Sequence, residues 1–204
     1  MRNLHANSNI DNIKIALDNS WVIDYLHKSK GISHELIQRL VKDGLLMQEA
    51  YTNNAVFKVI DEHGCCAGAE LNGTLKGLAE GSTCNYGFNL RYPKNAKTFE
   101  YCLFFESAID LLSFASLKTL PTFLLSQGRT SLDGCILVSM AGLKLNVLEH
   151  MVTIFNGGRV LCVNNGPAGA EFILEASDEP YLVCRPYPPS RDWNEQLRLQ
   201  QKSP

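Results

Sequence analysis

The chain has 204 residues, of which 45% are hydrophobic and 20% charged, and this is the composition of an ordinary globular protein. Its formal net charge is −2, which excludes a protein that attracts nucleic acid through its overall charge, so any such site has to be a local patch. The seven cysteines include no C-x-x-C pair, which excludes a zinc finger and a thioredoxin-like motif, and we expect them to be reduced and mostly buried.

The beginning of the chain, "MRNLHANSNIDN", is polar and lacks the apolar stretch of a signal peptide. No apolar run elsewhere reaches the length of a transmembrane helix. We therefore expect a cytoplasmic protein that has no membrane partner.

Two short amphipathic helices are predicted between residues 19 and 44. Apolar residues recur at helical spacing over 21–26 and again over 36–41. Ser33 is a candidate N-cap of the second helix, and Gly44 stands where that helix would end. The pair is compatible with a helix-turn-helix or with a small packing unit beside a larger domain.

Residues 51–92 are predicted to be rich in β-structure. Val56, Val59 and Ile60 suit a strand, "DEHG" suits a turn, and a small apolar arm follows, which together predict a β-hairpin. The glycine-rich segment 71–90 then predicts turns between short strands. It contains no phosphate-loop pattern, because no G-K-[ST] occurs in it.

From residue 98 onward, apolar runs alternate with helical patterns. The expected strands are 98–106, 122–128, 135–142, 159–165 and 181–186, and the expected helices are 107–120, 143–158, 167–176 and 192–201. Strands without polar alternation that alternate with helices predict a mainly parallel sheet covered by helices on both faces. The sequence thus predicts an α/β fold, with an α+β region of two helices and a small sheet at 1–97 and the larger domain at 98–204.

Several polar residues follow the predicted parallel strands and should meet at one edge of the sheet. Glu106 ends an apolar strand, and Asp110 lies one turn into the next helix. The segment "SRDWNEQL" adds Asp192 and Glu195. Converging carboxylates can hold Mg²⁺, which prefers oxygen ligands and can stabilise phosphoryl charge. A single glutamate at a strand end, such as Glu106, is equally compatible with a solvated residue or a partner of the helix N-terminus. Asp192 is equally compatible with a cap of the last helix.

Three segments carry a resemblance to a known family. "LFFESAIDLLSFASL", "RVLCVNNGPAGAEFI" and "SRDWNEQL" resemble the Toprim domain shared by bacterial primases and topoisomerases. The resemblance is strongest to primase-like proteins of bacterial mobile elements, in which a small domain of unknown function precedes the Toprim domain. Segments such as "YLHKSKGISHELIQRLVKDGLL" resemble that preceding domain, so the likeness extends from about residue 20 to 197. It implies a Rossmann-like Toprim domain at 98–204 and a Toprim-associated region at 1–97.

The family's catalytic pattern is a glutamate after the first strand and an Asp-x-Asp after a later strand, and these carboxylates bind Mg²⁺. Glu106 matches the glutamate, whereas Asn164 and Gly166 stand at the two aspartate positions. Each lost charge removes on the order of several kcal/mol of attraction for the metal at an effective dielectric constant of ~20. The resemblance therefore implies a degenerate site in which Glu106 is the one matched metal ligand and Mg²⁺-dependent chemistry is weakened or lost.

The turn Asn164-Asn165-Gly166 has a second possible use. We expect Gly166 to allow a positive φ and Pro167 to occupy the first position of the next helix. The amides at that helix start can receive a phosphate or another anion, or the segment is simply a strand–helix turn. Basic residues for a nucleic acid are Lys94, Arg185 and Arg191, with aromatic residues near Lys94 that suit stacking on single strands.

These observations predict a Toprim-like accessory protein of a mobile element that acts in replication or mobilisation. Its expected partners are single-stranded DNA or RNA, or a replication or mobilisation protein. Whether it is an enzyme stays open, and the missing acids argue against it. One alternative is an active primase-like or nuclease-like enzyme whose rearranged catalytic site uses Glu106, Asp110 and Asp192, and another is a protein-binding scaffold or inhibitor.

Overall fold

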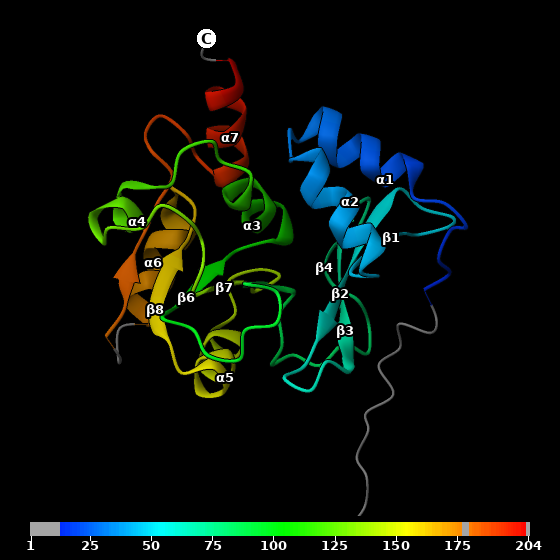
Figure 1. The fold of residues 1–204 in the computed structure, drawn as a ribbon. Coiled ribbons are helices and arrows are strands. Elements are labelled where there is room, and N and C mark those ends of the chain that lie inside the picture. Colours follow the sequence, from blue (N-terminus) through cyan, green and yellow to red (C-terminus); the bar gives the residue numbers. More distant parts are fainter. Residues whose placement is uncertain (1–12, 177–179, 203–204) are drawn as a thin grey trace, which may run out of the picture.

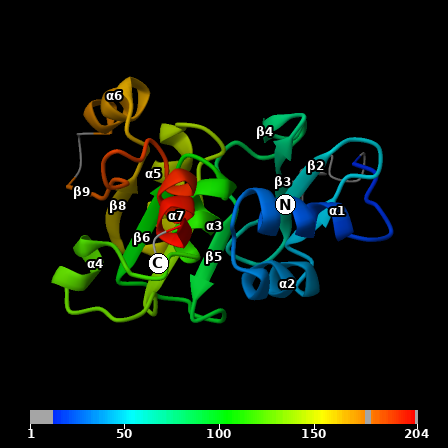
Figure 2. The same cartoon turned by 90° about the horizontal axis from the view of Figure 1, so that it is seen from above.

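Two β-sheets lie side by side in the computed structural model, which describes residues 13–176 and 180–202 (Figures 1 and 2). The polar segment 1–12, in which we predicted no signal peptide, lies outside the described residues. Within the described part of the chain, no helix is both long enough and apolar enough to cross a membrane. Four of the seven cysteines, Cys102, Cys135, Cys162 and Cys184, are buried.

The chain begins with the predicted helical pair. Helix α1 (Ser20–Asp24) continues without a break into a π-helical turn, η2 (Tyr25–Ser29), and α2 (His34–Lys42) follows. Ser33 caps α2 as predicted, because its side chain accepts a hydrogen bond from the Leu36 amide. The chain leaves this helix through Gly44, whose φ of 65° lies in the left-handed region that glycine tolerates.

A small antiparallel sheet follows the helices. Its strands are β1 (Leu46–Gln48), β2 (Asn54–Ile60), β3 (Cys66–Gly73) and β4 (Lys76–Leu78), and they pair in that order. The predicted hairpin is the β2–β3 pair, in which Val56 lies opposite Leu71. The expected small α+β region is therefore present.

The larger sheet has the order β5-β7-β6-β8-β9. Its strands are β5 (Asn89–Tyr92), β6 (Tyr101–Phe105), β7 (Cys135–Ser139), β8 (Gly158–Cys162) and β9 (Leu182–Val183). All neighbouring pairs are parallel except β5 with β7, so the predicted mainly parallel sheet is confirmed. Strand β5 comes from the segment 51–92 but belongs to this sheet, and the division at residues 97 and 98 stays a prediction.

Helices cover both faces of the larger sheet. They are α3 (Ala108–Ala115), α5 (Leu145–Phe155), α6 (Pro167–Glu175) and α7 (Trp193–Lys202). Leu103 and Phe105 of β6 pack with residues of α3 and α7, whereas the alternate residues Cys102 and Phe104 pack with residues of α5 and α6. Both faces are apolar for this reason, and the strand sequences show no polar alternation.

One predicted strand is wrong. Residues 122–128 contain a short helix, α4 (Thr122–Ser126), instead of a strand. The run is too short for its periodicity to separate the two structures. Only one side of it is buried, since Leu124 is inaccessible while Leu125 is 46% exposed. Both neighbours of β6 in the sheet are already β7 and β8, which leaves no central position for a further strand there.

Trp193 fixes the last helix to the sheet. Its side chain is fully buried, and its Nε1–H donates to the carbonyl oxygen of Cys162 at 2.8 Å, at the end of β8. The indole also packs edge-on against Phe114 and Phe105, with ring centroids 4.9 and 6.2 Å away. One residue thus joins α7, α3 and the carboxyl ends of two parallel strands.

We expect Trp193→Phe to lower the free energy of unfolding by about 1–3 kcal/mol, because the aromatic packing is retained while the buried Cys162 carbonyl loses its donor. Urea unfolding followed by far-UV circular dichroism measures this. Trp21→Phe is the control, since Trp21 is only partly buried and should change stability by less than about 0.5 kcal/mol. Equal stability of Trp193→Phe and the wild type would contradict this role.

Candidate functional site

Three polar residues meet at the carboxyl edge of the parallel strands. Phe105, the last residue of β6, pairs with Ser139 of β7 and with Cys162 of β8. Glu106 follows β6 directly, Ser139 ends β7, and Asn164 comes two residues after β8. The strand register alone therefore brings the turns after β6 and β8 next to each other, as the sequence predicts.

The Glu106 carboxylate is held by the turn after β8. The backbone amide of Asn164 donates to Glu106 Oε1 at 2.8 Å. Helix α6 approaches this pair closely at Gly169, where an added Cβ would lie 2.5 Å from the Asn164 carbonyl oxygen and 3.5 Å from Glu106 Oε1. The glycine of "PAG" thus has a steric reason, because any side chain there would push α6 off the turn.

Asp110 lies beside them in the first turn of α3 and is 7% exposed. Its Oδ2 accepts from Ser107 Oγ at 2.6 Å and from Asn164 Nδ2 at 3.3 Å. The pKa of Asp110 is raised to about 6, mainly by burial; the nearby charges of Asp192 and Glu106 add to this shift and the two hydrogen bonds oppose it. Asp110 therefore holds its proton to a higher pH than an exposed aspartate.

The donor set does not fit a bound Mg²⁺. Asn164 directs its backbone amide at one carboxylate and its side-chain NH₂ at the other, and a hydrogen-bond donor cannot ligate a cation. Its Oδ1 is buried and has no hydrogen-bond partner among the described residues. Across the same residues, no group of three or more His, Cys, Asp or Glu side chains is arranged to hold a metal ion. One amide oxygen beside two carboxylates is poor provision for an octahedral cation.

Asp192, the third acid of the predicted catalytic set, is engaged at the start of α7. Its Oδ1 accepts from the Glu195 amide at 2.7 Å, and Glu195 Oε2 accepts in turn from the Arg191 amide at 2.6 Å. Asp192 thus caps α7, and the Glu195 side chain holds the residue before the cap. The structure thus brings Glu106, Asp110 and Asn164 into one hydrogen-bonded group, and it gives Asp192 a capping function at its border.

The turn itself differs from our expectation. Gly166 has φ −179° and ψ 170°, which is extended backbone, so the predicted use of a positive φ is wrong, while Pro167 does occupy the first turn of α6. The Asn165 amide donates to the Arg191 carbonyl oxygen, and its side chain donates to the carbonyl oxygens of Pro186 and Ser190. Two of the three backbone amides proposed for an anion, those of residues 164 and 165, therefore already donate within the protein.

The predicted basic residues lie at different places. Arg191 is exposed at the start of α7 and pairs with Glu195 at 3.6 Å, and Arg185 follows β9 at the same edge of the sheet. Lys94 follows β5, which runs antiparallel to its neighbour β7, and the last residue of β5, Tyr92, pairs with the first residue of β7. Lys94 is therefore at the amino edge of the parallel strands, away from Glu106, where it pairs with Asp43 at 2.7 Å.

Sequence reasoning missed Glu70 of β3, which comes from the small sheet and is 2% exposed. Its Oε1 accepts from the Ala108 amide at the start of α3 at 2.7 Å, and its Oε2 accepts from Ser139 Oγ at 2.6 Å. Together with Glu106 and Asp110, Glu70 lines a cavity of about 360 Å³ between the two sheets. The signal in the sequence is a glutamate between small and apolar residues of a strand.

The pKa of Glu70 is raised to about 7, mainly by burial, and the neighbouring Asp110 charge adds to this shift. The bonds from the Ala108 amide and from Ser139, together with the positive charge of Lys144, oppose the shift. Glu70 is therefore a carboxyl group that titrates near neutral pH at the contact between the two sheets.

A second cavity of about 360 Å³ lies beside the Asp192 cap. Four basic side chains line it, one that directly follows η2 and three from around α7, together with the acids Asp192 and Glu195. The basic residues are Lys30, Arg191, Arg198 and Lys202. This α7 groove, defined by these four basic residues, carries an excess of positive charge next to the carboxylate edge.

The sequence is similar to a protein family and to a bacterial relative, which the following matches describe. Residues 24–96 match the family described as "Protein of unknown function (DUF3991)". The uncharacterized protein pXO2-78 of Bacillus anthracis is 31% identical over 209 residues, a match that covers 86% of this chain and 56% of that protein. The chain thus spans little more than half the length of this relative.

Two solved structures show the same architecture. The primase fragment of the bacteriophage T7 primase-helicase protein matches 86% of this chain and 70% of its own, with a TM-score of 0.59 and 17% identity. The fold is primase-like. The T7 primase domains that were solved with the lagging-strand DNA polymerase, an RNA/DNA hybrid and dTTP match 85% of this chain and 88% of their own, with a TM-score of 0.55 and 15% identity.

Glu70 has a testable effect on stability. Its pKa is raised in the folded state from an ordinary value of 4.5 to about 7, so the native protein binds a proton that the unfolded chain releases in this interval. The free energy of unfolding should therefore fall as pH rises from about 4.5 to 7, by about 3 kcal/mol from this group. In Glu70→Gln this part of the slope should disappear, because the amide can still accept from Ala108 and donate to Ser139.

Urea unfolding across this pH interval measures the slope. Glu80→Gln is the matched control, because Glu80 is exposed and should leave the wild-type slope unchanged. Asp110 contributes a slope of the same sign at lower pH in all three proteins. A Glu70→Gln slope equal to that of the wild type would show that Glu70 is ionised in the folded protein throughout.

Proposed function

We propose that this protein is a Toprim-like, nucleic-acid-associated accessory protein of a mobile element, acting in replication or mobilisation without efficient Mg²⁺-dependent phosphoryl transfer. One observation carries the proposal. At the place where the Toprim pattern has its first paired aspartate, Asn164 donates hydrogen bonds to Glu106 and to Asp110. An amide therefore bridges the two carboxylates at this place.

Charge supports the loss of metal-dependent chemistry. A Toprim site would offer three carboxylates, whereas Glu106 is the one acid at the three matched positions. Asp110 does not replace a missing acid at neutral pH as well as an ordinary aspartate would, because its pKa is raised to about 6 and Ser107 already donates to it. A hard, strongly hydrated cation is not drawn from water by so weak a donor set.

The nucleic-acid part of the proposal is supported by what surrounds this edge. The α7 groove supplies basic side chains on one side of it. Next to the groove, Trp21 and Tyr25 are stacked with ring centroids 5.1 Å apart, and Lys30, which also lines the groove, has its Nζ 5.5 Å from the Tyr25 ring centroid. Cations next to partly exposed aromatic rings are the combination that binds single strands without sequence preference.

The aromatic pair is connected to the carboxylate cavity. Tyr25 OH donates to Asn72 Oδ1 at 3.1 Å, and Asn72 lines the cavity that contains Glu106 and Asp110. A single strand that stacks on Trp21 and Tyr25 would thus have the α7 groove beside it at Lys30 and the carboxylate cavity beside it at Asn72. The likeness of the fold to T7 primase domains, one of them solved with an RNA/DNA hybrid, supports a nucleic-acid partner in preference to a protein partner alone.

A second candidate function is an active primase-like or nuclease-like enzyme with a rearranged site. It is favoured by the cavity in which three carboxyl groups, those of Glu70, Glu106 and Asp110, face the same space. Two observations weigh against it: Asp192 is occupied as a helix cap, and the pKa values of Glu70 and Asp110 are raised.

Restoring the acids tests the proposal. Gly166 has an extended backbone and an added Cβ there meets no atom within 4 Å, so Gly166→Asp is sterically free. We expect the double variant Asn164→Asp/Gly166→Asp to bind Mg²⁺ measurably by isothermal titration calorimetry. Without metal it should be less stable than the wild type, because the carboxylate introduced at position 164 would lie against Glu106 and Asp110. The wild type should show no saturable Mg²⁺ binding.

Gly166→Ala is the control for the loss of glycine alone, and it should neither bind Mg²⁺ nor lose stability. Saturable Mg²⁺ binding by the wild type that disappears in Glu106→Gln would contradict the proposal and favour the rearranged enzyme. A double variant that stays folded but gains no affinity for Mg²⁺ would contradict the interpretation of Asn164 and Gly166 as lost ligands.

The α7 groove gives a prediction for nucleic acid. We expect Arg198→Ala/Lys202→Ala to weaken the binding of a single-stranded oligonucleotide at low salt by at least about tenfold, and to reduce the slope of log K against log salt by about 1.4, or about 0.7 for each lost phosphate contact. Fluorescence anisotropy over a salt series measures both quantities.

Lys42→Ala/Lys97→Ala is the matched control, because it removes the same charge from exposed positions outside the groove. Equal losses in the two double variants would show that only the overall charge matters. If the wild type fails to bind single strands even at the lowest salt, the nucleic-acid part of the proposal is wrong.

A further inference from the structure

Two buried cysteines lie opposite each other on neighbouring parallel strands. Strands β8 and β9 pair so that Leu161 lies opposite Val183. The same register places Cys162, the last residue of β8, opposite Cys184. The Cys184 amide continues the ladder, because it donates to the carbonyl oxygen of Leu161 at 3.0 Å. Neighbouring strands lie about 4.8 Å apart, which is within the roughly 4.4–6.8 Å that separates the Cα atoms of a disulfide.

The side chains of these two cysteines also lie on the same face of the sheet. Cys162 and Cys184 belong to one buried cluster with Trp193, on the face that α3 and α7 cover. Their thiols form a hydrogen bond with each other. Cys102 and Cys135 are on neighbouring strands as well, but they belong to different clusters on opposite faces of the sheet. Cys162 and Cys184 thus have the placement that a disulfide needs.

The strand that leads to Cys184 is at the edge of the sheet. Strand β9 has two residues, Leu182 and Val183, which are 45% and 43% exposed, and no strand of the described residues pairs with its outer side. Short, exposed elements of this kind open locally at a low cost in free energy. Opening brings Cys184 to solvent first, because Cys162 lies on the inner strand. Burial also raises the pKa of the Cys162 thiol, which therefore keeps its proton.

We propose that Cys162 and Cys184 are an oxidation site that forms a reversible disulfide with a hydroperoxide as the oxidant. When β9 opens, the Cys184 thiolate attacks the O–O bond of the peroxide and becomes a sulfenic acid, and the leaving hydroxide takes up the proton that Cys184 released. When β9 closes, the Cys162 sulfur attacks the sulfenic sulfur. The S–S bond forms, and the hydroxyl group leaves with the Cys162 proton as water. With hydrogen peroxide, two thiols thus give up two electrons, and one peroxide becomes two waters.

The disulfide fixes the chain segment that holds the carboxyl edge. Two residues after Cys184, the carbonyl oxygen of Pro186 accepts from Asn165 Nδ2 at 2.8 Å. The carbonyl oxygen of Cys162 accepts from the Trp193 indole at 2.8 Å. A bond between the two sulfur atoms therefore joins the end of β8 covalently to the segment between β9 and α7. The bond requires neither a metal nor a nucleic acid, so this proposal and the proposed function succeed or fail separately.

Peptide mapping without reductant, after treatment of the folded full chain with hydrogen peroxide, tests the proposal. The exposed Cys65 and Cys84 are first replaced by serine, which removes competing thiols. We expect a linked pair of peptides that contain Cys162 and Cys184, together with the loss of two thiols per chain, and dithiothreitol should reverse both. Cys102, which is also buried, should stay reduced.

Single variants test the order of the two steps. Cys162→Ala should leave Cys184 as a sulfenic acid, which dimedone labels, whereas Cys184→Ala should leave Cys162 unlabelled. Circular dichroism checks that both variants are folded. Cys102→Ala is the matched control, because it also removes a buried thiol and should form the disulfide as the wild type does. Labelling of Cys162 in Cys184→Ala as fast as that of Cys184 in Cys162→Ala would contradict the order.

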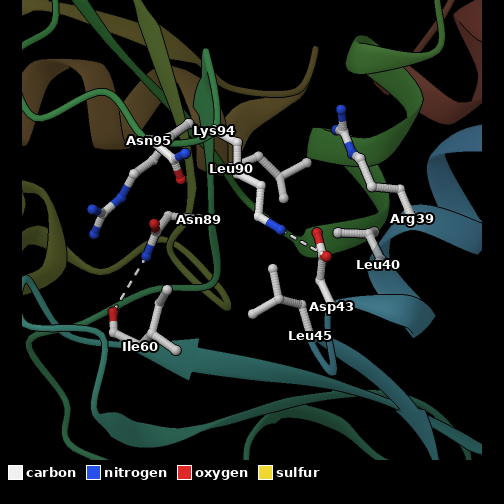
Figure 3. A pocket seen from close by; sticks show the side chains of 10 residues that line it. Arg39, Leu40, Asp43, Leu45, Ile60, Asn89, Leu90, Lys94 and Asn95 are labelled. Carbon is white, nitrogen blue, oxygen red and sulfur yellow. Dashed lines mark hydrogen bonds and ion pairs between the residues drawn. The ribbon is translucent and has the colours of Figure 1, made fainter.

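Hydrogen exchange measures whether the disulfide holds β9 in place. Peptides that cover residues 182–184 should exchange at least about tenfold more slowly after oxidation, because the bond opposes local opening. Strand β5 at the other edge of the sheet is the internal reference, and peptides with Leu90 and Lys94, which line a small cavity there (Figure 3), should exchange as before. The proposal is overturned if the folded chain forms no link between Cys162 and Cys184, or if the link leaves exchange at 182–184 unchanged.

Discussion

The interaction on which the carboxyl edge depends is the pair of hydrogen bonds that Asn164 donates, from its backbone to Glu106 and from its side chain to Asp110. Two carboxyl groups in a confined space repel each other unless a cation or a donor lies between them. In this chain the donor is an amide. Gly169 lets α6 come close to the same turn, and the Trp193 indole holds the carbonyl of Cys162 at the end of β8. The primase-like fold thus ends in an edge where the amide of Asn164 lies between two carboxyl groups.

The carboxyl group of Glu70 joins the two sheets. Glu70 extends from the small sheet to the first amide of α3 and to Ser139, directly beside the group formed by Glu106, Asp110 and Asn164. A buried carboxyl group that titrates near neutral pH links protonation to the contact between the sheets. The Trp21–Tyr25 pair adjoins the α7 groove at Lys30 and the carboxylate cavity at Asn72, so the proposed site for a single strand lies beside the place where the sheets meet.

The sequence predicted local features well and long-range contacts poorly. The apolar runs of β6 and β8, the Ser33 cap and the order of strands and helices follow from periodicity and capping, and Glu106 and Asn164 meet because parallel strands end at one edge. Glu70 was missed because its partners lie on other elements far along the chain, and nothing local marks them. Residues 122–128 were assigned to a strand because an apolar run of that length fits a strand as well as a helix, and only the crowding beside β6 decides between them. The prediction of a positive φ at Gly166 was wrong. The backbone there is extended, and the Asn165 side chain holds the turn through its bonds to the carbonyl oxygens of Pro186 and Ser190.

The central claim is that Asn164 and its two carboxylates form a closed hydrogen-bonded group that does not hold a divalent cation. Anomalous diffraction from a crystal soaked in Mn²⁺ tests it most directly, because Mn²⁺ takes the same oxygen ligands as Mg²⁺ and its position can be located independently of the protein atoms. The account predicts no anomalous peak within ligand distance of Glu106 and an intact contact between the Asn164 amide and Glu106 Oε1. A Mn²⁺ ion bound by Glu106 together with Asp110 or Glu70 would contradict it and would establish the carboxylate edge as a working metal site.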